Sequence, residues 1–172
     1  MSISIVDVIE TVVHAMYFIF PAYCANAAPV IFGGGLPLDA GRLFPDGKPI
    51  FGSHKTVRGL LAGLIIGTLV GFAQQFVPFG QQSALLGFTL SLGALVGDLM
   101  DSFMKRRLGL VPGSPVPLAD QLDFVLGAFL FSVAIGQSPP IFWILIILLV
   151  TPPIHLVTNF VAYLLGAKNK TR

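Results

Sequence analysis

The sequence predicts an all-α, polytopic membrane protein with five transmembrane helices, its N-terminus outside and its C-terminus in the cytoplasm. Hydrophobic residues make up 55% and charged residues 10% of the 172-residue chain, whereas a typical soluble domain carries about 25% charged residues. A globule with so few charges could not cover its surface with polar groups, so the bilayer is the expected solvent. The single cysteine, Cys24, excludes an internal disulfide and a cysteine metal cage, and a net charge of +2 is too small to indicate nucleic-acid binding.

Five apolar segments account for the predicted spans. A helix needs about 20 predominantly apolar residues to cross the hydrocarbon core of a bilayer. The first segment is not a cleavable signal peptide, because it carries Asp7 and Glu10 where a signal peptide has basic residues, and its apolar run is too long. The expected spans are residues 5–31, 60–77, 83–100, 122–137 and 141–165.

Proline and glycine predict how these spans are joined and packed. A Pro-Phe-Gly-Gln-Gln turn at 78–82 joins the second and third spans, and Ser-Pro-Pro at 138–140 joins the fourth and fifth. Small residues spaced by four let two helices approach closely. Glycines at this spacing are Gly59, Gly63, Gly67 and Gly71 in the second span, and Gly93 and Gly97 in the third.

The basic residues predict the orientation. All ten Lys and Arg lie in two polar connections, about 32–58 and 101–120, or in the C-terminal tail with Lys168, Lys170 and Arg172, and the tight turns carry none. Basic loops favour the cytoplasmic side, and four or six spans would scatter these charges over both faces. We therefore expect a single integral-membrane domain over residues 1–172 in the cell membrane, with its functional face toward the cytoplasm.

Ionisable side chains gather at the predicted cytoplasmic ends of the third and fourth spans. Asp98 follows a long uncharged stretch, and a carboxylate there is costly unless it meets a cation or lines a wet cavity. The connection to the next span is short enough for the aspartates of both helices to converge. At 100° per residue one face of the third helix carries Asp98, Asp101, Ser102 and Lys105, and the fourth helix opens with Asp120 and Asp123.

Carboxylates beside basic residues suit a site for Mg²⁺ and a polyphosphate. Mg²⁺ takes oxygen ligands, commonly one or two carboxylates plus phosphate oxygens, and Lys and Arg neutralise the remaining phosphate charge. Two simpler interpretations stand beside this one. Asp120 and Asp123 have the N-cap and N3 spacing of a helix cap, and the basic run at 105–107 could be a positive-inside stop signal. Asp98 fits neither, and it favours a functional site.

The first long connection adds an anion-binding pattern. Gly52-Ser53-His54-Lys55-Thr56 leads directly into a helix and offers backbone N–H groups, hydroxyls and a lysine to an anionic group. It is not a P-loop, because the G-x-x-x-x-G-K-[ST] spacing is missing.

These segments resemble the phosphatidate cytidylyltransferase family. Residues 53–59, Ser-His-Lys-Thr-Val-Arg-Gly, are similar to the family's Ser-Lys-Thr-Gly segment, and residues 97–106 are similar to the Gly-Asp, Ser and Lys-Arg core of its signature. Residues 120–123 stand where the signature has Asp-Arg-x-Asp, with Gln121 in place of the arginine. The resemblance is closest to the archaeal branch of the family, which forms CDP-archaeol, and there it covers nearly the whole chain.

The resemblance implies transfer of a cytidylyl group from CTP to a membrane-embedded archaeal ether-lipid phosphate, 2,3-bis-O-geranylgeranyl-glycerol 1-phosphate. The products would be CDP-archaeol and pyrophosphate. It implies one or two Mg²⁺ ions on Asp98, Asp120 and Asp123, with Asp101 as a further ligand candidate, and Lys55 as a catalytic residue beside them. The residues expected to bind the phosphates and nucleotide are Thr56, Arg58, Ser102, Lys105 and Arg106, together with Asp39 and Asp46 of the first connection.

Two other functions compete with this expectation. A CDP-alcohol phosphotransferase also uses aspartates and Mg²⁺ at the membrane edge, but its motif needs glycine where Ser102 follows Asp101, and the spacing from Asp120 to Asp123 is one residue short. A small cation-coupled transporter would need polar residues continuing toward the outer face, where the spans are nearly all apolar. Asn26, His155 and Asn159 could face a lipid headgroup or form an interhelical hydrogen-bond stripe, and both interpretations stay open.

Overall fold

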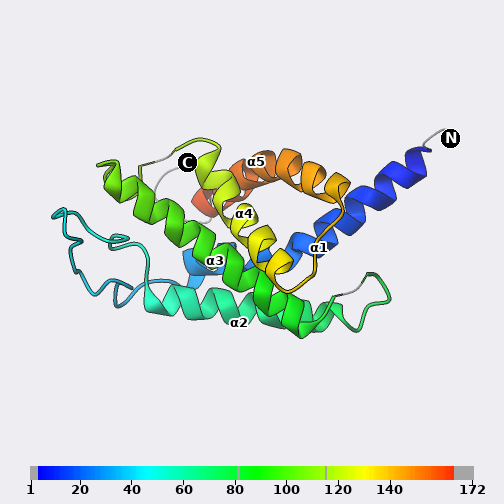
Figure 1. Ribbon diagram of the computed structural model, residues 1–172, viewed down its shortest axis with the longest axis horizontal. Helices are drawn as coiled ribbons and strands as arrows, with labels where there is room; N and C mark the ends of the chain where they lie inside the picture. The colour runs from blue at the N-terminus through cyan, green and yellow to red at the C-terminus, as the bar shows by residue number, and fades with distance from the viewer. Residues whose placement is uncertain (1–3, 81, 115, 165–172) are drawn as a thin grey trace.

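A computed structural model describes residues 4–80, 82–114 and 116–164, within which it contains helices and no strand. The connections 33–56 and 108–118 gather at one end of the bundle, the loop end, and the short connections 75–83 and 135–140 lie at the other, the turn end (Figure 1). The predicted all-α architecture is confirmed. The helices are α1 (Ile5–Phe32), α2 (Val57–Gln74), α3 (Ala84–Arg107), α4 (Ala119–Ala134) and α5 (Ile141–Leu164).

Four of the described helices are long and apolar enough to cross a membrane: α1, α2, α3 and the Ile141–Val161 part of α5. Helix α4 has 16 residues, which at 1.5 Å per residue is about 24 Å, against a hydrocarbon core of about 30 Å. Large apolar side chains on the outer helix faces are exposed, Leu149 and Leu130 among them. The structure is therefore that of a multi-pass membrane protein with four helices of spanning length.

Several helix ends differ from the predicted spans. Helix α2 ends at Gln74 rather than at residue 77, and α4 covers Ala119–Ala134 rather than 122–137. Helix α3 continues past the end of the predicted apolar span at Met100 and runs to Arg107, because the basic residues of its last turn interact favourably with the negative end of the helix dipole. The second connection is accordingly shorter than the predicted 101–120. Helix α2 begins earlier than predicted, because the Thr56 hydroxyl accepts the Gly59 N–H at 3.1 Å and caps the helix.

The glycine faces pack helix against helix at backbone contact. All four glycines of α2 that repeat every four residues are buried. A Cβ atom placed on Gly63 would lie 2.6 Å from the Ala25 carbonyl oxygen, and one on Gly87 would lie 2.6 Å from the Gly71 Cα. The predicted close-packing role of the α2 glycines is therefore confirmed, and α2 packs closely on both α1 and α3.

A second glycine contact joins α3 to α4. Gly93 and Gly97 of α3 face Gly127, which lies on α4 and was not among the predicted packing residues. A Cβ atom on Gly127 would lie 2.9 Å from the Gly97 Cα. This contact adjoins Asp98 and lies one helical turn from Asp123, so it fixes how closely the acidic ends of the two helices approach.

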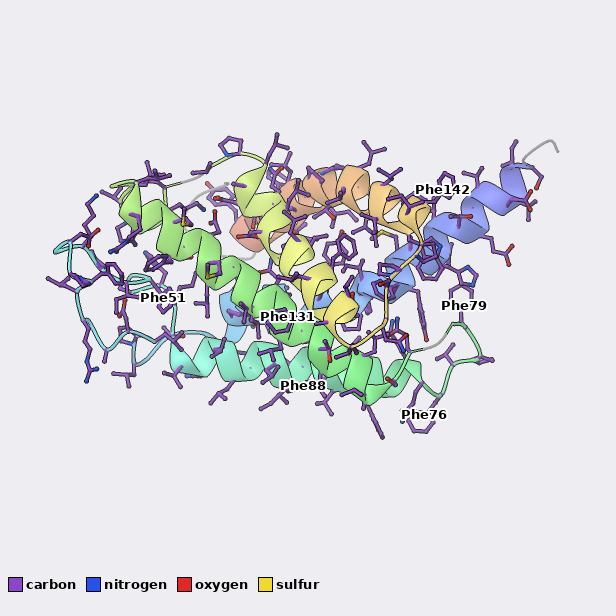
Figure 2. The ribbon with its side chains drawn as sticks, in the orientation of Figure 1. Phe51, Phe76, Phe79, Phe88, Phe131 and Phe142 are labelled. Carbon is purple, nitrogen blue, oxygen red and sulfur yellow. The ribbon has the colours of Figure 1, made fainter. Side chains whose placement is uncertain are left out.

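The apolar core is formed by α1, α3 and α4 with one contribution from α5. Tyr23 of α1 packs its ring edge against Phe124 at 5.4 Å, and its hydroxyl meets the Thr151 hydroxyl of α5 at 2.7 Å. At the turn end His14 stacks on Phe79 at 4.4 Å, and Figure 2 shows Phe79 there with Phe142. The buried core residues are Ala15, Phe18, Ile19, Ala22, Leu86, Leu90, Ala94, Phe124, Val125, Ala128, Phe129 and Ile147.

Asp39 organises the long connection 33–56. Its carboxylate is buried and accepts the backbone N–H groups of Gly41, Phe51 and Gly52, each at 3.0 Å. Burial by itself raises the pKa of Asp39, but these backbone hydrogen bonds outweigh it and hold the pKa below its ordinary value. The carboxylate therefore holds the loop together by accepting hydrogen bonds from its backbone, and the ligand-binding role expected of Asp39 stays a prediction.

Arg107 fastens the same connection to the end of α3. Its guanidinium lies over the rings of Phe44 and Phe103, at 4.5 and 4.8 Å from their centroids, and pairs with Asp46 at 2.6 Å. It also donates to the Pro49 carbonyl oxygen. Asp46 is therefore an exposed ion-pair partner of Arg107, and its place in the binding site stays a prediction.

We expect Gly127→Val to destabilise the protein by about 1–3 kcal/mol, the usual cost of overpacking a tight contact. The added side chain would push α4 away from the Gly97 backbone. Thermal unfolding in detergent micelles, followed by circular dichroism, measures the effect. Leu130→Val, at an exposed position of the same helix, is the matched control and should unfold near the wild-type temperature. An unchanged unfolding temperature for Gly127→Val would contradict a backbone contact between α3 and α4.

Candidate active site

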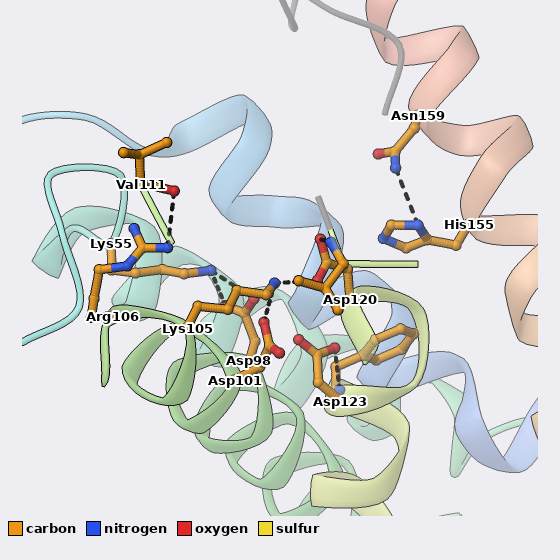
Figure 3. Close-up of polar contacts among 12 residues, drawn as sticks. Lys55, Asp98, Asp101, Lys105, Arg106, Val111, Asp120, Asp123, His155 and Asn159 are labelled. Carbon is orange, nitrogen blue, oxygen red and sulfur yellow. Dashed lines mark hydrogen bonds and ion pairs between the residues drawn. The ribbon is translucent and has the colours of Figure 1, made fainter. Parts of the chain in front are cut away.

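Four aspartates converge at the loop end between α3 and α4. Asp98 and Asp101 extend from α3, and Asp120 and Asp123 extend from the first turns of α4. Figure 3 shows these carboxylates around the ammonium groups of two lysines, one from the connection 33–56 and one from α3. The structure therefore brings together acidic residues separated in the sequence by the second connection.

Lys55 links the long connection to α3. Its ammonium group donates to both carboxylate oxygens of Asp98, at 2.6 and 2.5 Å. The two side chains are about a quarter exposed, at 26% and 24%, so water screens this pair only partly. Thr56, the next residue, holds the segment in place by accepting the Gly34 N–H at 3.2 Å as well as capping α2.

Lys105 holds α3 and α4 together. Its ammonium group forms ion pairs with Asp101 on its own helix and with Asp120 on α4. The lysine is buried, and a buried charge is tolerated only when opposite charges offset the loss of hydration. Lys105 is therefore the counterion of two carboxylates in this structure, which differs from the direct phosphate contact predicted for it.

The helix-cap interpretation of the Asp120–Asp123 pair is wrong. The N-cap position of α4 is Leu118, which makes no side-chain cap hydrogen bond. Asp120 instead accepts the Val116 N–H at 3.2 Å, and Asp123 accepts the N–H of its neighbour Phe124 at 2.6 Å. Neither carboxylate caps the helix, so helix capping does not explain why the two aspartates are present at the start of α4.

Asp123 lies in an unfavourable position for a negative charge, because it is shielded from water and lies near other carboxylates. It feels the negative charges of Asp98 and Asp101, and the positive charge of Lys55 acts in the opposite direction. Its described hydrogen bond comes from a backbone N–H rather than from a cation. A carboxylate held beside like charges is stabilised when a further cation enters the site.

The donor set fits a hard divalent cation. Carboxylate oxygens are the protein ligands that Mg²⁺ takes, together with water and phosphate oxygens. Among residues 4–80, 82–114 and 116–164 no three potential ligands lie close enough together to form a metal cluster. Lysine ammonium groups lie between the carboxylates instead, with Lys55 on Asp98 and Lys105 on Asp101 and Asp120.

The remaining predicted binding residues take different positions. Arg106 is buried and turns toward the second connection, where it donates to the Val111 carbonyl oxygen at 3.1 Å (Figure 3). Ser102 is half-buried on the same face of α3 as the aspartates, and Arg58 is exposed on the first turn of α2. Their contacts with a substrate stay predictions.

His155 and Asn159 lie one helical turn apart on α5. The Asn159 side-chain amide meets the His155 ring at 3.1 Å (Figure 3), and Asn159 is buried. Asn26 of α1 is half-buried. The polar stripe of α5 therefore has an internal hydrogen bond, and its part in binding stays a prediction.

Sequence reasoning missed Lys48 as a feature of the loop end. Its ammonium group donates to the Arg107 carbonyl oxygen at 3.0 Å and lies beside Arg106 in a small cavity. The sequence showed Lys48 only as one of ten basic residues, in a loop without periodicity. The signal that would have found it is the end of α3 at Arg107, because a cation pairs favourably with the last carbonyl groups of a helix.

Comparison with known proteins agrees with this architecture. A CDP-archaeol synthase from Pyrococcus furiosus is 47% identical over 88% of this chain and 93% of its own length. A CDP-archaeol synthase from Methanocaldococcus jannaschii is 43% identical over 90% of this chain and 94% of its own. A solved structure described as an intramembrane enzyme for archaeal membrane lipids biosynthesis superimposes with a TM-score of 0.77 at 38% identity, covering 87% of this chain and 94% of that one.

The family assignment rests on nearly the whole chain. The family model described as CarS-like, CDP-archaeol synthase, matches residues 5–171, which include all five helices and both long connections. The resemblance to the archaeal branch of the cytidylyltransferases is thereby confirmed. The chain belongs to the CDP-archaeol synthase family.

Proposed function

We propose that this protein transfers the cytidylyl group of CTP to the phosphate of a membrane-embedded archaeal ether lipid, 2,3-bis-O-geranylgeranyl-glycerol 1-phosphate. The products are CDP-archaeol and pyrophosphate. The observation that carries the proposal is the gathering of Lys55, Asp98 and Asp123 at one end of an apolar helix bundle, in a chain of the CDP-archaeol synthase family.

The reaction asks for positioning and charge neutralisation rather than for a general base. A phosphate monoester has a second pKa of about 6, so the lipid phosphate is largely dianionic near neutral pH. One of its oxygens attacks the α-phosphorus of CTP, the bond from that phosphorus to the bridging oxygen of the β-phosphate breaks, and pyrophosphate leaves with the electron pair. Lys55 can neutralise phosphate charge at this site, because its ammonium group lies among the acidic residues, 2.5 Å from the Asp98 carboxylate.

We further propose that Mg²⁺ binds to Asp98, Asp120 and Asp123, with Asp101 as an additional ligand. Bound there, the ion would neutralise charge on the phosphates and stabilise the in-line displacement. The like-charge environment of Asp123 supports the assignment. Lys55 and Lys105 would then share the carboxylates with a second kind of cation.

We propose that all five helices cross the membrane, with the N-terminus outside and the loop end in the cytoplasm. The described basic residues lie in the long connections, at the first turn of α2 or in the last turn of α3, all at the loop end (Figure 1), as the positive-inside rule requires. Helix α4 is short, but its neighbours can thin the bilayer around it at modest cost. CTP would then enter from the cytoplasm and the lipid from the membrane.

Asp98→Asn and Asp123→Asn should each lower the rate of CDP-lipid formation at least 100-fold, because loss of one preorganised group at a charge-transfer centre costs about 10²–10³ in rate. The assay measures incorporation of labelled CTP into lipid by purified protein with Mg²⁺ and the ether-lipid phosphate. Glu10→Gln removes an exposed carboxylate at the opposite end of the molecule and should keep the wild-type rate. A wild-type rate for Asp98→Asn would rule out the assigned mechanism.

Mg²⁺ should raise the unfolding temperature in the absence of nucleotide, because a ligand that binds only the folded state stabilises it by about 2.7 kcal/mol at 100 times its Kd. Lys105→Met leaves Asp101 and Asp120 without their shared cation, so it should unfold earlier in KCl and gain more from Mg²⁺ than wild type. Asp98→Asn combined with Asp123→Asn should lose the Mg²⁺ response. Equal shifts in all variants at matched ionic strength would argue against a metal at this site.

Single-cysteine labelling tests the five spans and the orientation. In a Cys24→Ser background, Ser138→Cys in the turn after α4 should react with a membrane-impermeant maleimide on intact cells. Ser53→Cys in the connection 33–56 should react only after permeabilisation; both serines are exposed. Labelling of both positions from the same side would mean that α4 does not cross the membrane.

A further inference from the structure

A row of apolar side chains runs along α3 and continues past the predicted end of its apolar span. Its members repeat every four residues, so they form one continuous strip that is inclined to the helix axis. None of them is buried, and the last three are exposed. This strip, the outer row, consists of Phe88, Leu92, Val96, Met100, Met104 and Leu108.

The end of α3 shows the reverse of the burial expected for a helix end in water. Lys105 and Arg106 are buried, at 9% and 4% exposure, while their neighbours Met104 and Leu108 are 52% and 73% exposed. The Lys105 ammonium group pairs with carboxylates of α3 and α4 instead of facing outward. In a protein surrounded by water, lysine and arginine are almost never fully buried. Charges turned inward beside apolar side chains turned outward indicate contact with an apolar medium.

The length of α3 places this surface at the boundary of the bilayer. The 24 residues of the helix span about 36 Å, whereas the hydrocarbon core is about 30 Å thick and each headgroup layer adds about 5–7 Å. Counted from Ala84, Met104 lies about 30 Å along the axis and Leu108 about 36 Å. With the turn end at the opposite boundary, the outer row therefore passes from the hydrocarbon into the headgroup layer, where α3 projects beyond the start of α4 (Figure 1).

Leu118, at the start of α4, is a further exposed apolar residue of the loop end. Its backbone has φ +66°, a conformation that bulky side chains rarely adopt, and it occupies the N-cap position without providing a side-chain cap. Glycine or asparagine would fit this position with less strain. The Leu118 side chain is nevertheless 60% exposed. Such a side chain gains nothing in water, whereas contact with lipid would offset part of the strain.

We propose that the end of α3 and the start of α4 insert into the headgroup layer of the leaflet at the loop end, with Met104, Leu108 and Leu118 in contact with lipid. The outer row is continuous with Phe88, which is exposed in the part of α3 that crosses the hydrocarbon. A specific protein interface buries roughly 800 Å² on each partner, more than one row of side chains offers. The bilayer, rather than a second protein, is therefore the partner that this surface fits.

The same contact sets the depth of the acidic cluster, and this part of the inference rests on the proposed function. Asp98 and Asp101 precede Met104 on the same helix, within about 9 Å along its axis. The cluster therefore lies at the edge of the hydrocarbon, directly beside the layer that contains the phosphates of membrane lipids. Held at this depth, the site can reach the phosphate of its lipid substrate while the chains of that lipid stay in the bilayer.

Tryptophan quenching tests the membrane contact without turnover. Trp143 is the single tryptophan, so in a Trp143→Phe background each of Met104→Trp, Leu108→Trp and Leu118→Trp reports on one position. In phosphatidylcholine nanodiscs, lipids brominated on their acyl chains should quench these variants about threefold more than Arg42→Trp, since interfacial apolar side chains lie about 5–10 Å into the boundary. Arg42 is an exposed residue of the connection 33–56, outside the proposed contact, and iodide in the water should quench it instead.

Two results would overturn the membrane contact. Iodide quenching of Met104→Trp and Leu108→Trp equal to that of Arg42→Trp would place the outer row in water. Protection of these positions from both quenchers would mean that another protein covers the row. Disulfide formation by Leu108→Cys in a Cys24→Ser background would then identify that protein as a second copy of this chain.

Activity tests the depth of the cluster. Met104→Gln combined with Leu108→Gln should raise the KM for the lipid phosphate in nanodiscs several-fold and leave the KM for CTP unchanged, because glutamine is polar but similar in size to the residues it replaces. Arg42→Gln should change neither KM. An unchanged KM for the lipid would overturn the link between the outer row and the site. If wild type forms no CDP-lipid while brominated lipids still quench Met104→Trp, the proposed function fails and the membrane contact stands.

Discussion

The contact of bare backbones between α3 and α4 is the constraint on which the site depends. Gly97 lies against the backbone of Asp123, whose carbonyl carbon would be 3.0 Å from a Cβ atom on that glycine, and against Gly127. The aspartates of the candidate active site therefore lie next to the glycines that permit close helix packing. Because the helices meet at Gly97 and Gly127 by their backbones, the carboxylates of α3 and α4 lie at the same end of the bundle. Lys55 pairs there with Asp98, and Lys105 pairs with Asp101 and Asp120.

Such a concentration of negative charge needs compensation before any ligand arrives. Lys55 supplies it from outside the bundle and Lys105 from within, where it pairs with carboxylates of both helices. In a partly buried setting these attractions offset a desolvation penalty and add little net stability. These ion pairs instead specify how the segments are arranged. Lys55 joins the connection 33–56 to α3, and Lys105 joins α3 to α4.

The sequence predicted which segments form helices better than it predicted where each helix begins and ends. Hydropathy and glycine spacing identified every helix, and the helical periodicity of Asp98 and Asp101 placed them on one face. The apolar pattern of α3 ends at Met100, and the basic run at 105–107 suits both a loop and a helix C-terminus, so hydropathy alone did not give the end of the helix at Arg107. The pairing of Lys105 with Asp120 and the enclosure of Asp39 by backbone N–H groups depend on how the connections fold. Those connections contain no periodic pattern, so these contacts could not be predicted from the sequence.

The two short connections at the turn end have a consequence for how the molecule assembles. They make α2–α3 and α4–α5 into hairpins of neighbouring segments, whose contacts are local in sequence and close at small entropic cost. Asp98 and Asp101 belong to the first hairpin, and Asp120 and Asp123 belong to the second. The acidic cluster exists only where the two hairpins meet, so it forms when α3 packs against α4. A newly made chain would therefore have a complete acidic cluster only after its tertiary structure has formed. Either hairpin alone would carry two of the four carboxylates, without the residues that they contact on the other hairpin.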